Sequence, residues 1–154
     1  MLKLFLASLL VGSGILLGAV LAIIAKEELK PGMKYFLLIK NIIYPAIILI
    51  ASFYYFDINF IISVLLLIFI PIIFIKKFQL SLIYISFAII YMLSGINSSL
   101  FLLISSLIFF AGFPIASIAV SDLKKNKLFN KKILAPYILF IFIVASKYII
   151  QFFL

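Results

Sequence analysis

The chain contains no cysteine and no histidine among its 154 residues. Without cysteine it can form no disulfide and no thiolate metal site, and it has no thiol nucleophile. Without histidine it lacks the commonest metal ligand and the one side chain whose unperturbed pKa lies near neutrality. The sequence therefore predicts no metal site and no cofactor.

Acidic residues are almost as scarce, because the chain has only four: Glu27, Glu28, Asp57 and Asp122. In the topology predicted below, Asp57 lies on the opposite side of the membrane from the other three, which leaves few carboxylates for catalysis or metal binding. The chain also contains no GxSxG nucleophile motif and no phosphate-binding P-loop. We therefore predict that it is not an enzyme.

Apolar residues dominate the composition. Hydrophobic residues make up 68% of the chain and charged residues only 11%, with a mean hydropathy of +1.46, whereas a globular domain is about half apolar and a quarter charged. The chain has too few polar residues to cover the surface of a soluble fold. Its apolar side chains must therefore face lipid. We predict an integral membrane protein that forms a single transmembrane domain over residues 1–154.

Six apolar runs are expected to cross the membrane as helices. The first has 22 residues without a charge, enough at 1.5 Å per residue to span about 30 Å of hydrocarbon. It exceeds the apolar core of a signal peptide, so we expect it to be retained. The predicted fold class is an all-α helical bundle with short loops. Its spans are residues 4–25, 35–56, 58–75, 80–94, 100–120 and 135–154.

Turn-forming residues separate several of these spans. Pro31 and Gly32 suit the central positions of a tight turn, because proline presets φ and glycine tolerates a positive φ. We expect the chain to reverse there. The glycine, asparagine and serine cluster at residues 95–99 predicts a hairpin, since one helix over both flanking spans would be about 60 Å long.

Lysines indicate how the spans are oriented, because short loops rich in lysine and arginine stay in the cytoplasm. With six spans, the first, third and fifth loops share one side and hold 11 of the 13 lysines, whereas the second and fourth loops hold none. We therefore expect both termini outside and these loops in the cytoplasm. The cytoplasmic lysines are Lys26, Lys30, Lys34, Lys40, Lys76, Lys77, Lys124, Lys125, Lys127, Lys131 and Lys132.

Two sets of small residues predict close helix packing. Gly14, Gly18 and Ala22 recur every four residues on one face of the first span, and Gly112 and Ala116 do so in the fifth. Such faces let the backbones of membrane helices approach each other. They either pack against another helix of the same chain or dock a partner subunit or a second copy.

Lysines also predict two kinds of contact at the membrane surfaces. On the outer side, Lys147 either extends to the interface or forms an ion pair with Asp57, the only acid predicted there. The fifth loop is expected to contact anionic lipid headgroups or an acidic protein, which explains the net charge of +9 without nucleic acid. The residues expected to make these contacts are Lys124, Lys125, Lys127, Lys131 and Lys132.

Prolines within the spans bear on whether the helices enclose a cavity. Pro45, Pro71 and Pro114 map to the cytoplasmic halves of their spans, and each removes a backbone hydrogen bond. Either the kinks open a cytoplasmic vestibule, or they bend the helices into a compact bundle. No ionisable residue is predicted at the bilayer centre, where ion and proton pathways normally place one.

The segment KEELKPGMKYF at residues 26–36 resembles the first loop of uncharacterised small archaeal membrane proteins, and the helix before it shares the resemblance. The resemblance implies an archaeal membrane but no activity. The use of lysine and no arginine indicates an AT-rich prokaryotic genome. We expect a non-enzymatic polytopic membrane protein, a structural or accessory subunit that packs against lipid or membrane partners. The alternative is a small transporter or lipid-handling protein with a cavity on its cytoplasmic side.

Overall fold

The computed structural model contains helices and no strand in the residues that it describes, which are 2–56, 58–68, 70, 79–95, 97–121 and 131–153. At residues 2–5, 79, 131–133 and 147–153 only the backbone is described. The all-helical fold predicted from the sequence is confirmed. The helices are α1 (Leu2–Ile24), α2 (Lys26–Phe56), α3 (Phe60–Leu67), α4 (Gln79–Ser94), α5 (Ser98–Ser121) and α6 (Lys131–Phe153).

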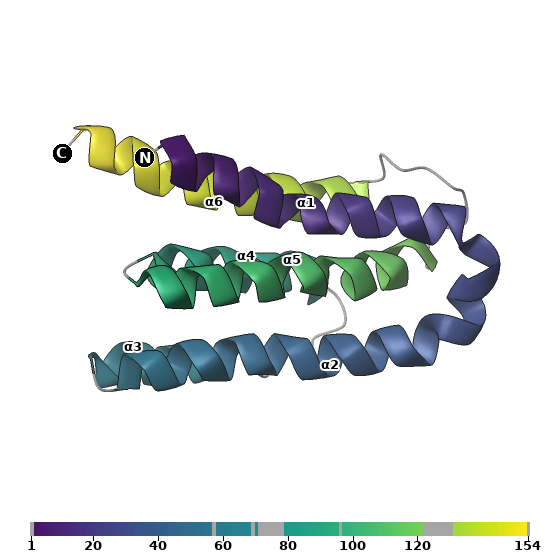
Figure 1. Cartoon of the computed structure of the whole chain (residues 1–154), viewed down its shortest axis with the longest axis horizontal. Helices are drawn as coiled ribbons and strands as arrows, with labels where there is room; N and C mark the ends of the chain where they lie inside the picture. The colour runs from purple at the N-terminus through teal and green to yellow at the C-terminus, as the bar shows by residue number, and fades with distance from the viewer. Residues whose placement is uncertain are drawn as a thin grey trace.

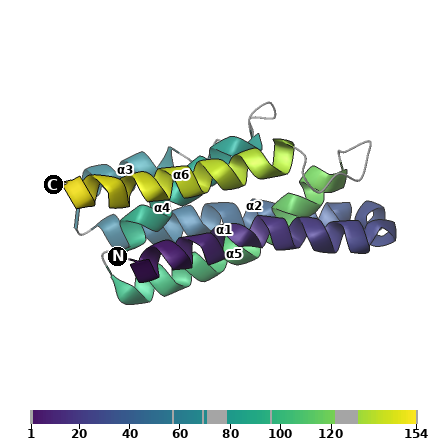
Figure 2. The ribbon, with the colours of Figure 1, turned by 90° about the horizontal axis from the view of Figure 1, so that it is seen from above.

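These helices stack in three layers (Figure 1), with α1 and α6 in one layer, α4 and α5 in the middle, and α2 and α3 in the third. Seen from above, their axes run roughly along one direction (Figure 2). α1 and α5 run in the same direction, and α1 begins at the end of the bundle where α6 ends. Helix α5 lies in the middle layer and contacts α1, α2, α4 and α6, so it is the central element of the packing.

The junction between α1 and α2 differs from the prediction. α2 begins at Lys26, so Pro31 and Gly32 lie inside a helix of 31 residues and form no tight turn. No described glycine has the positive φ that this turn requires. Good helix formers flank the pair, so the helix continues through it. The chain reverses instead through the break at Ala25 and the curved first part of α2 (Figure 1).

Two asparagines start helices at the opposite end of the bundle. The Asn59 side-chain oxygen accepts hydrogen bonds from the backbone N–H groups of Ile61 at 3.1 Å and Ile62 at 3.3 Å, at the start of α3. The Asn97 oxygen accepts from Ser99 at 2.9 Å and Leu100 at 3.2 Å, at the start of α5. Both satisfy backbone donors that have no partner within the helix. The predicted hairpin between α4 and α5 is confirmed.

Within the described ranges, three helices are long and apolar enough to cross a membrane, over Leu6–Ile24, Lys26–Phe56 and Ser98–Ser121. Two shorter apolar helical stretches cover Leu80–Ser94 and Leu134–Ser146. α3 has eight residues, whereas a crossing needs about 20. Residue 69 and residues 71–75 of the predicted third span lie outside the described part. Six crossings therefore stay a prediction.

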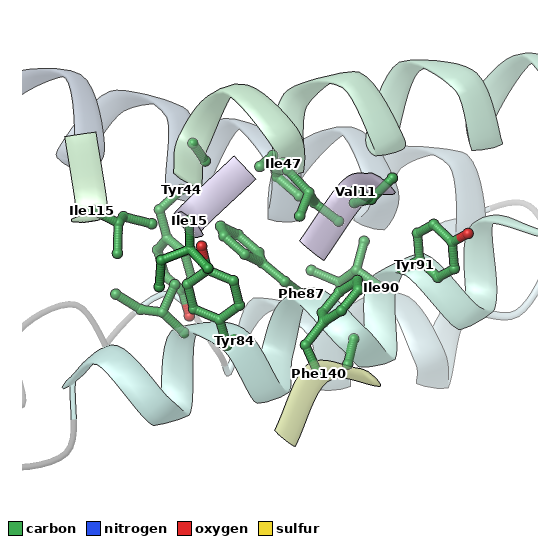
Figure 3. Packing of buried hydrophobic residues seen from close by; sticks show 14 of the residues in the cluster. Val11, Ile15, Tyr44, Ile47, Tyr84, Phe87, Ile90, Tyr91, Ile115 and Phe140 are labelled. Carbon is green, nitrogen blue, oxygen red and sulfur yellow. The ribbon is translucent and has the colours of Figure 1, made fainter. Parts of the chain in front are cut away.

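Buried aromatic rings connect α2, α4 and α6 in the core (Figure 3). The ring centroid of Phe87 on α4 lies 5.7 Å from that of Tyr44 on α2 and 5.7 Å from that of Tyr84. The ring of Phe140 on α6 lies 5.7 Å from that of Tyr91. Aromatic pairs at such distances stabilise a fold beyond their area of burial. They join helices that belong to all three layers.

Candidate functional site

The small residues predicted on α1 and α5 face each other. A Cβ atom added at Gly14 would collide with the backbone carbonyl of Phe109, and one added at Gly112 would lie 2.6 Å from the backbone nitrogen of Ile15. Non-bonded heavy atoms prefer about 3.5–4 Å, so neither position has room for a side chain. At this crossing the two backbones are in direct contact.

This contact continues along α1. A Cβ atom added at Gly18 would lie 2.7 Å from the Phe113 Cα and 3.0 Å from the Ala116 Cβ. Ala22 and Ala116 are both buried. We call the surface formed by Gly14, Gly18, Ala22, Gly112 and Ala116 the α1–α5 interface. Both predicted small-residue faces are therefore covered within the chain.

Two tyrosines of α2 form hydrogen bonds with α4. The Ser86 hydroxyl donates its hydrogen to the Ile83 carbonyl at 2.7 Å, so the Tyr44 hydroxyl donates to Ser86 Oγ at 3.2 Å. Eleven residues further along α2, the Tyr55 hydroxyl donates to the Leu93 carbonyl at 2.7 Å. Because 11 residues of helix span about 16 Å, these bonds hold α2 to α4 at two separate levels.

Three buried hydroxyls have no hydrogen-bond partner in the described part of the chain: Tyr84 Oη, Ser52 Oγ and Ser105 Oγ. Most other described serines donate to a carbonyl of their own helix, for example Ser94 to Tyr91 at 2.8 Å. An unpartnered hydroxyl in an apolar interior carries an uncompensated desolvation cost. We find no contact that explains these three positions.

Lys40 lies where the sequence did not predict it. The sequence placed it with the loop lysines, but it belongs to α2 and only 6% of its surface is exposed. It shares the core-facing side of α2 with Tyr44, Ile47 and Ile48, at the spacing of a helix face. The methylene stem of Lys40 is buried, but its Nζ atom is not fully buried. The ammonium therefore reaches the surface. The i, i+4 and i+7 spacing was the signal that could have placed it.

A groove lies where the end of α1, the start of α2 and the last turns of α5 meet. Its volume is about 160 Å³, and it is open on one side. Its walls are almost entirely apolar, and Glu28 is the only charged residue among them. The sequence did not predict this groove, because it forms only when three helix ends come together. The lining residues are Gly18, Leu21, Ala22, Ala25, Glu28, Leu29, Phe36, Phe113 and Ser117.

Several predicted contacts fall outside the described residues. Asp57 and the side chain of Lys147 are not described, so their ion pair stays a prediction. The same holds for contacts of the fifth loop with lipid, since Lys124, Lys125 and Lys127 also lie outside. Lys131 and Lys132 were predicted in that loop but form the first turn of α6, and only their backbone is described.

No protein-family model, no curated protein and no solved structure matches this chain. Among the described residues, no group of three or more histidine, cysteine, aspartate or glutamate side chains could hold a metal ion.

We predict that Gly14→Ala destabilises the protein by about 1–3 kcal/mol, because the added methyl group overlaps the backbone of Phe109. Gly32→Ala is the matched control. Its methyl group would meet only the Phe36 ring, at 3.1 Å, which can move, and alanine favours a helix over glycine by about 0.5–1 kcal/mol. Unfolding in mixed SDS micelles followed by circular dichroism measures both changes. Equal effects of the two substitutions would contradict the close backbone contact.

A second pair of substitutions tests the buried hydroxyls. Tyr84→Phe removes an unpartnered hydroxyl and should stabilise the fold by about 1 kcal/mol. Tyr44→Phe removes the bond to Ser86 and should destabilise the fold by about 0.5–1.5 kcal/mol. Each change deletes one oxygen and keeps the ring, so the same unfolding assay isolates the hydrogen bond. A loss of stability in Tyr84→Phe would reveal a partner for that hydroxyl.

Proposed function

We propose that this protein is a six-span integral membrane protein and acts as a non-catalytic subunit that packs against lipid or other membrane proteins. The observation that carries the proposal is the distribution of polar and apolar side chains on α2. Its buried residues include Tyr44 and Ser52, whereas Phe53 is 75% exposed. A water-soluble helix shows the opposite arrangement.

The same arrangement extends over the rest of the described surface, where 25 large hydrophobic side chains are exposed. On α3, Phe60, Ile61, Val64 and Leu65 are all exposed, and the helix packs mainly against α2. So large an apolar surface would make a soluble monomer aggregate. Lipid or a membrane partner would cover it, which supports the proposed location.

The orientation that we propose has the lysine-rich end in the cytoplasm and both termini outside. The exposed Lys26, Lys30 and Lys34 lie at the end of the bundle where α1 meets α2. The chain ends lie at the other end. Lysines gathered at one end fit the retention of positively charged loops in the cytoplasm.

A partner protein or a second copy would need a surface other than the α1–α5 interface, because that interface is covered within the chain. α1 offers one on a neighbouring face. Five large apolar residues there share one helix face and are exposed, and we call them the outer stripe of α1. The outer stripe comprises Leu6, Leu10, Leu17, Leu21 and Ile24.

A lipid-handling protein is the second candidate function, and the groove beside Glu28 is the observation that favours it. The groove lies at the lysine-rich end of the bundle, the side on which the alternative hypothesis places a cavity. An apolar cavity of about 150 Å³ is large enough to hold a benzene-sized ligand, so the groove has room for a segment of hydrocarbon.

Single-cysteine labelling tests the orientation, since the chain has no cysteine of its own. Lys30→Cys and Ser98→Cys place a thiol at exposed positions on opposite ends of the bundle. In intact cells, a membrane-impermeant maleimide should label Ser98→Cys and should reach Lys30→Cys only after the membrane is opened. Labelling of both thiols from outside would contradict the proposed topology.

Purification in mild detergent tests the subunit role. We expect the wild-type protein to retain a membrane protein or a second copy, and Leu10→Ala with Leu17→Ala to lose it, because both residues belong to the outer stripe. Ile61→Ala with Leu65→Ala on α3 is the control and should keep the bound protein. These side chains are of similar size and are also exposed, but they lie outside the outer stripe. Light scattering of the complexes, compared with the 17.4 kDa chain, gives the stoichiometry. A monomer with no bound protein in every variant would contradict this role.

A further inference from the structure

We propose that the groove beside Glu28 binds a phospholipid with an ammonium headgroup, its acyl chain along the apolar walls and its ammonium at the Glu28 carboxylate. The proposal rests on the membrane location proposed above and deepens the lipid-handling candidate. It names the site, the class of lipid and the residue that selects it.

The shape and lining of the groove fit an amphiphile. Gly18, Leu21 and Phe113 form apolar walls along α1 and α5, and Glu28 lies at the α2 end. From Gly18 to Ala25 the groove follows α1 for about 10 Å. One end is therefore charged and the rest is apolar, which matches a headgroup followed by hydrocarbon.

The charge of Glu28 decides which headgroup fits. In the described part of the chain Glu28 makes no ion pair, although Lys26 and Lys30 are close in sequence. Lys26 and Lys30 are each two positions from Glu28, and side chains two positions apart on a helix do not face each other. The positions three and four after Glu28, which do face it, hold Pro31 and Gly32, and neither is charged. Among the described residues no cation pairs with this carboxylate, so we propose that it binds a cation from outside the chain. A zwitterionic headgroup offers an ammonium to Glu28 and a phosphate to the exposed lysines of this end, Lys26 and Lys30, whereas a purely anionic headgroup has no cation for Glu28.

The groove itself follows from features that the fold already needs. Small residues at Gly18 and Ala22 bring α1 close to α5, and the reversal at Ala25 brings α2 across the end of α1. The Ser117 hydroxyl donates to the Phe113 carbonyl at 2.9 Å, so it adds no free donor to the wall. Glu28 is therefore the polar side chain of the lining that a ligand can use.

Quenching of a single tryptophan by brominated lipids tests the proposal, because the chain contains no tryptophan. Phe36→Trp places the reporter in the groove wall, and Phe53→Trp places a control on the exposed face of α2. Each variant is reconstituted in phosphatidylcholine bilayers. Brominated phosphatidylethanolamine, phosphatidylglycerol or phosphatidylcholine is then added in increasing proportion.

We expect brominated phosphatidylethanolamine to quench Phe36→Trp at about two- to fivefold lower mole fraction than the other two lipids, the range of an exposed ion pair. Adding Glu28→Gln to this variant should abolish the preference and leave non-selective quenching. Adding Ala25→Leu, which fills the groove from its exposed rim, should weaken quenching by all three lipids. Phe53→Trp should respond equally to all three.

Three results would overturn the proposal. The first is equal quenching of Phe36→Trp by all lipids or a preference for phosphatidylglycerol, and the second is a preference that survives Glu28→Gln. The third is a groove reporter that no lipid quenches while Phe53→Trp is quenched, which would mean that protein covers the groove. If lipid quenched neither reporter, the membrane location would fail as well, so the two failures are distinguishable.

Discussion

The direct contact between the backbones of α1 and α5 is the constraint on which the rest of the structure depends. Gly14 and Gly112 lie against each other's helices so closely that neither position tolerates a Cβ atom. Lipid tails are as apolar as leucine, so burial of apolar surface provides little drive for helices to associate within a bilayer. Close van der Waals contact has to provide it, and glycine permits the closest approach.

The position of α5 explains why this contact matters beyond the pair itself. α5 also packs against α2, α4 and α6, and 11 of its residues are buried. Once α1 and α5 are fixed, the middle layer has a defined place for α4. The hydrogen bonds of Tyr44 and Tyr55 then attach α2 to α4. Polar groups therefore act inside the bundle, where a hydroxyl without a partner is costly and a satisfied one specifies an arrangement.

The groove beside Glu28 results from the same geometry. Small residues on α1 bring α5 close, and the chain then reverses at Ala25 without a tight turn. The groove lies where the curved start of α2 meets these two helices, and one carboxylate lies among its apolar walls. Gly18 and Ala22 thus belong both to the α1–α5 interface and to the lining of the groove.

Much of this could be read from residue types and spacing. The apolar composition predicted a membrane protein, the all-helical class followed from the long runs, and the spacing of Gly14, Gly18 and Ala22 marked a packing face. Asn97 and its neighbours marked the connection between α4 and α5. These features are local, because a turn residue or a helix face depends on residues within a few positions.

Other features depend on residues far apart in the chain, and only the tertiary structure decided them. Pro31 and Gly32 read as a turn, yet the helix continues through them, since good helix formers flank the pair. Lys40 reads as a loop lysine, yet its stem lies on the buried face of α2. The sequence by itself determined that the chain is helical and apolar. The pairing of α1 with α5 and the groove at Glu28 required the fold, because spacing within a helix does not specify which partner helix its face will meet.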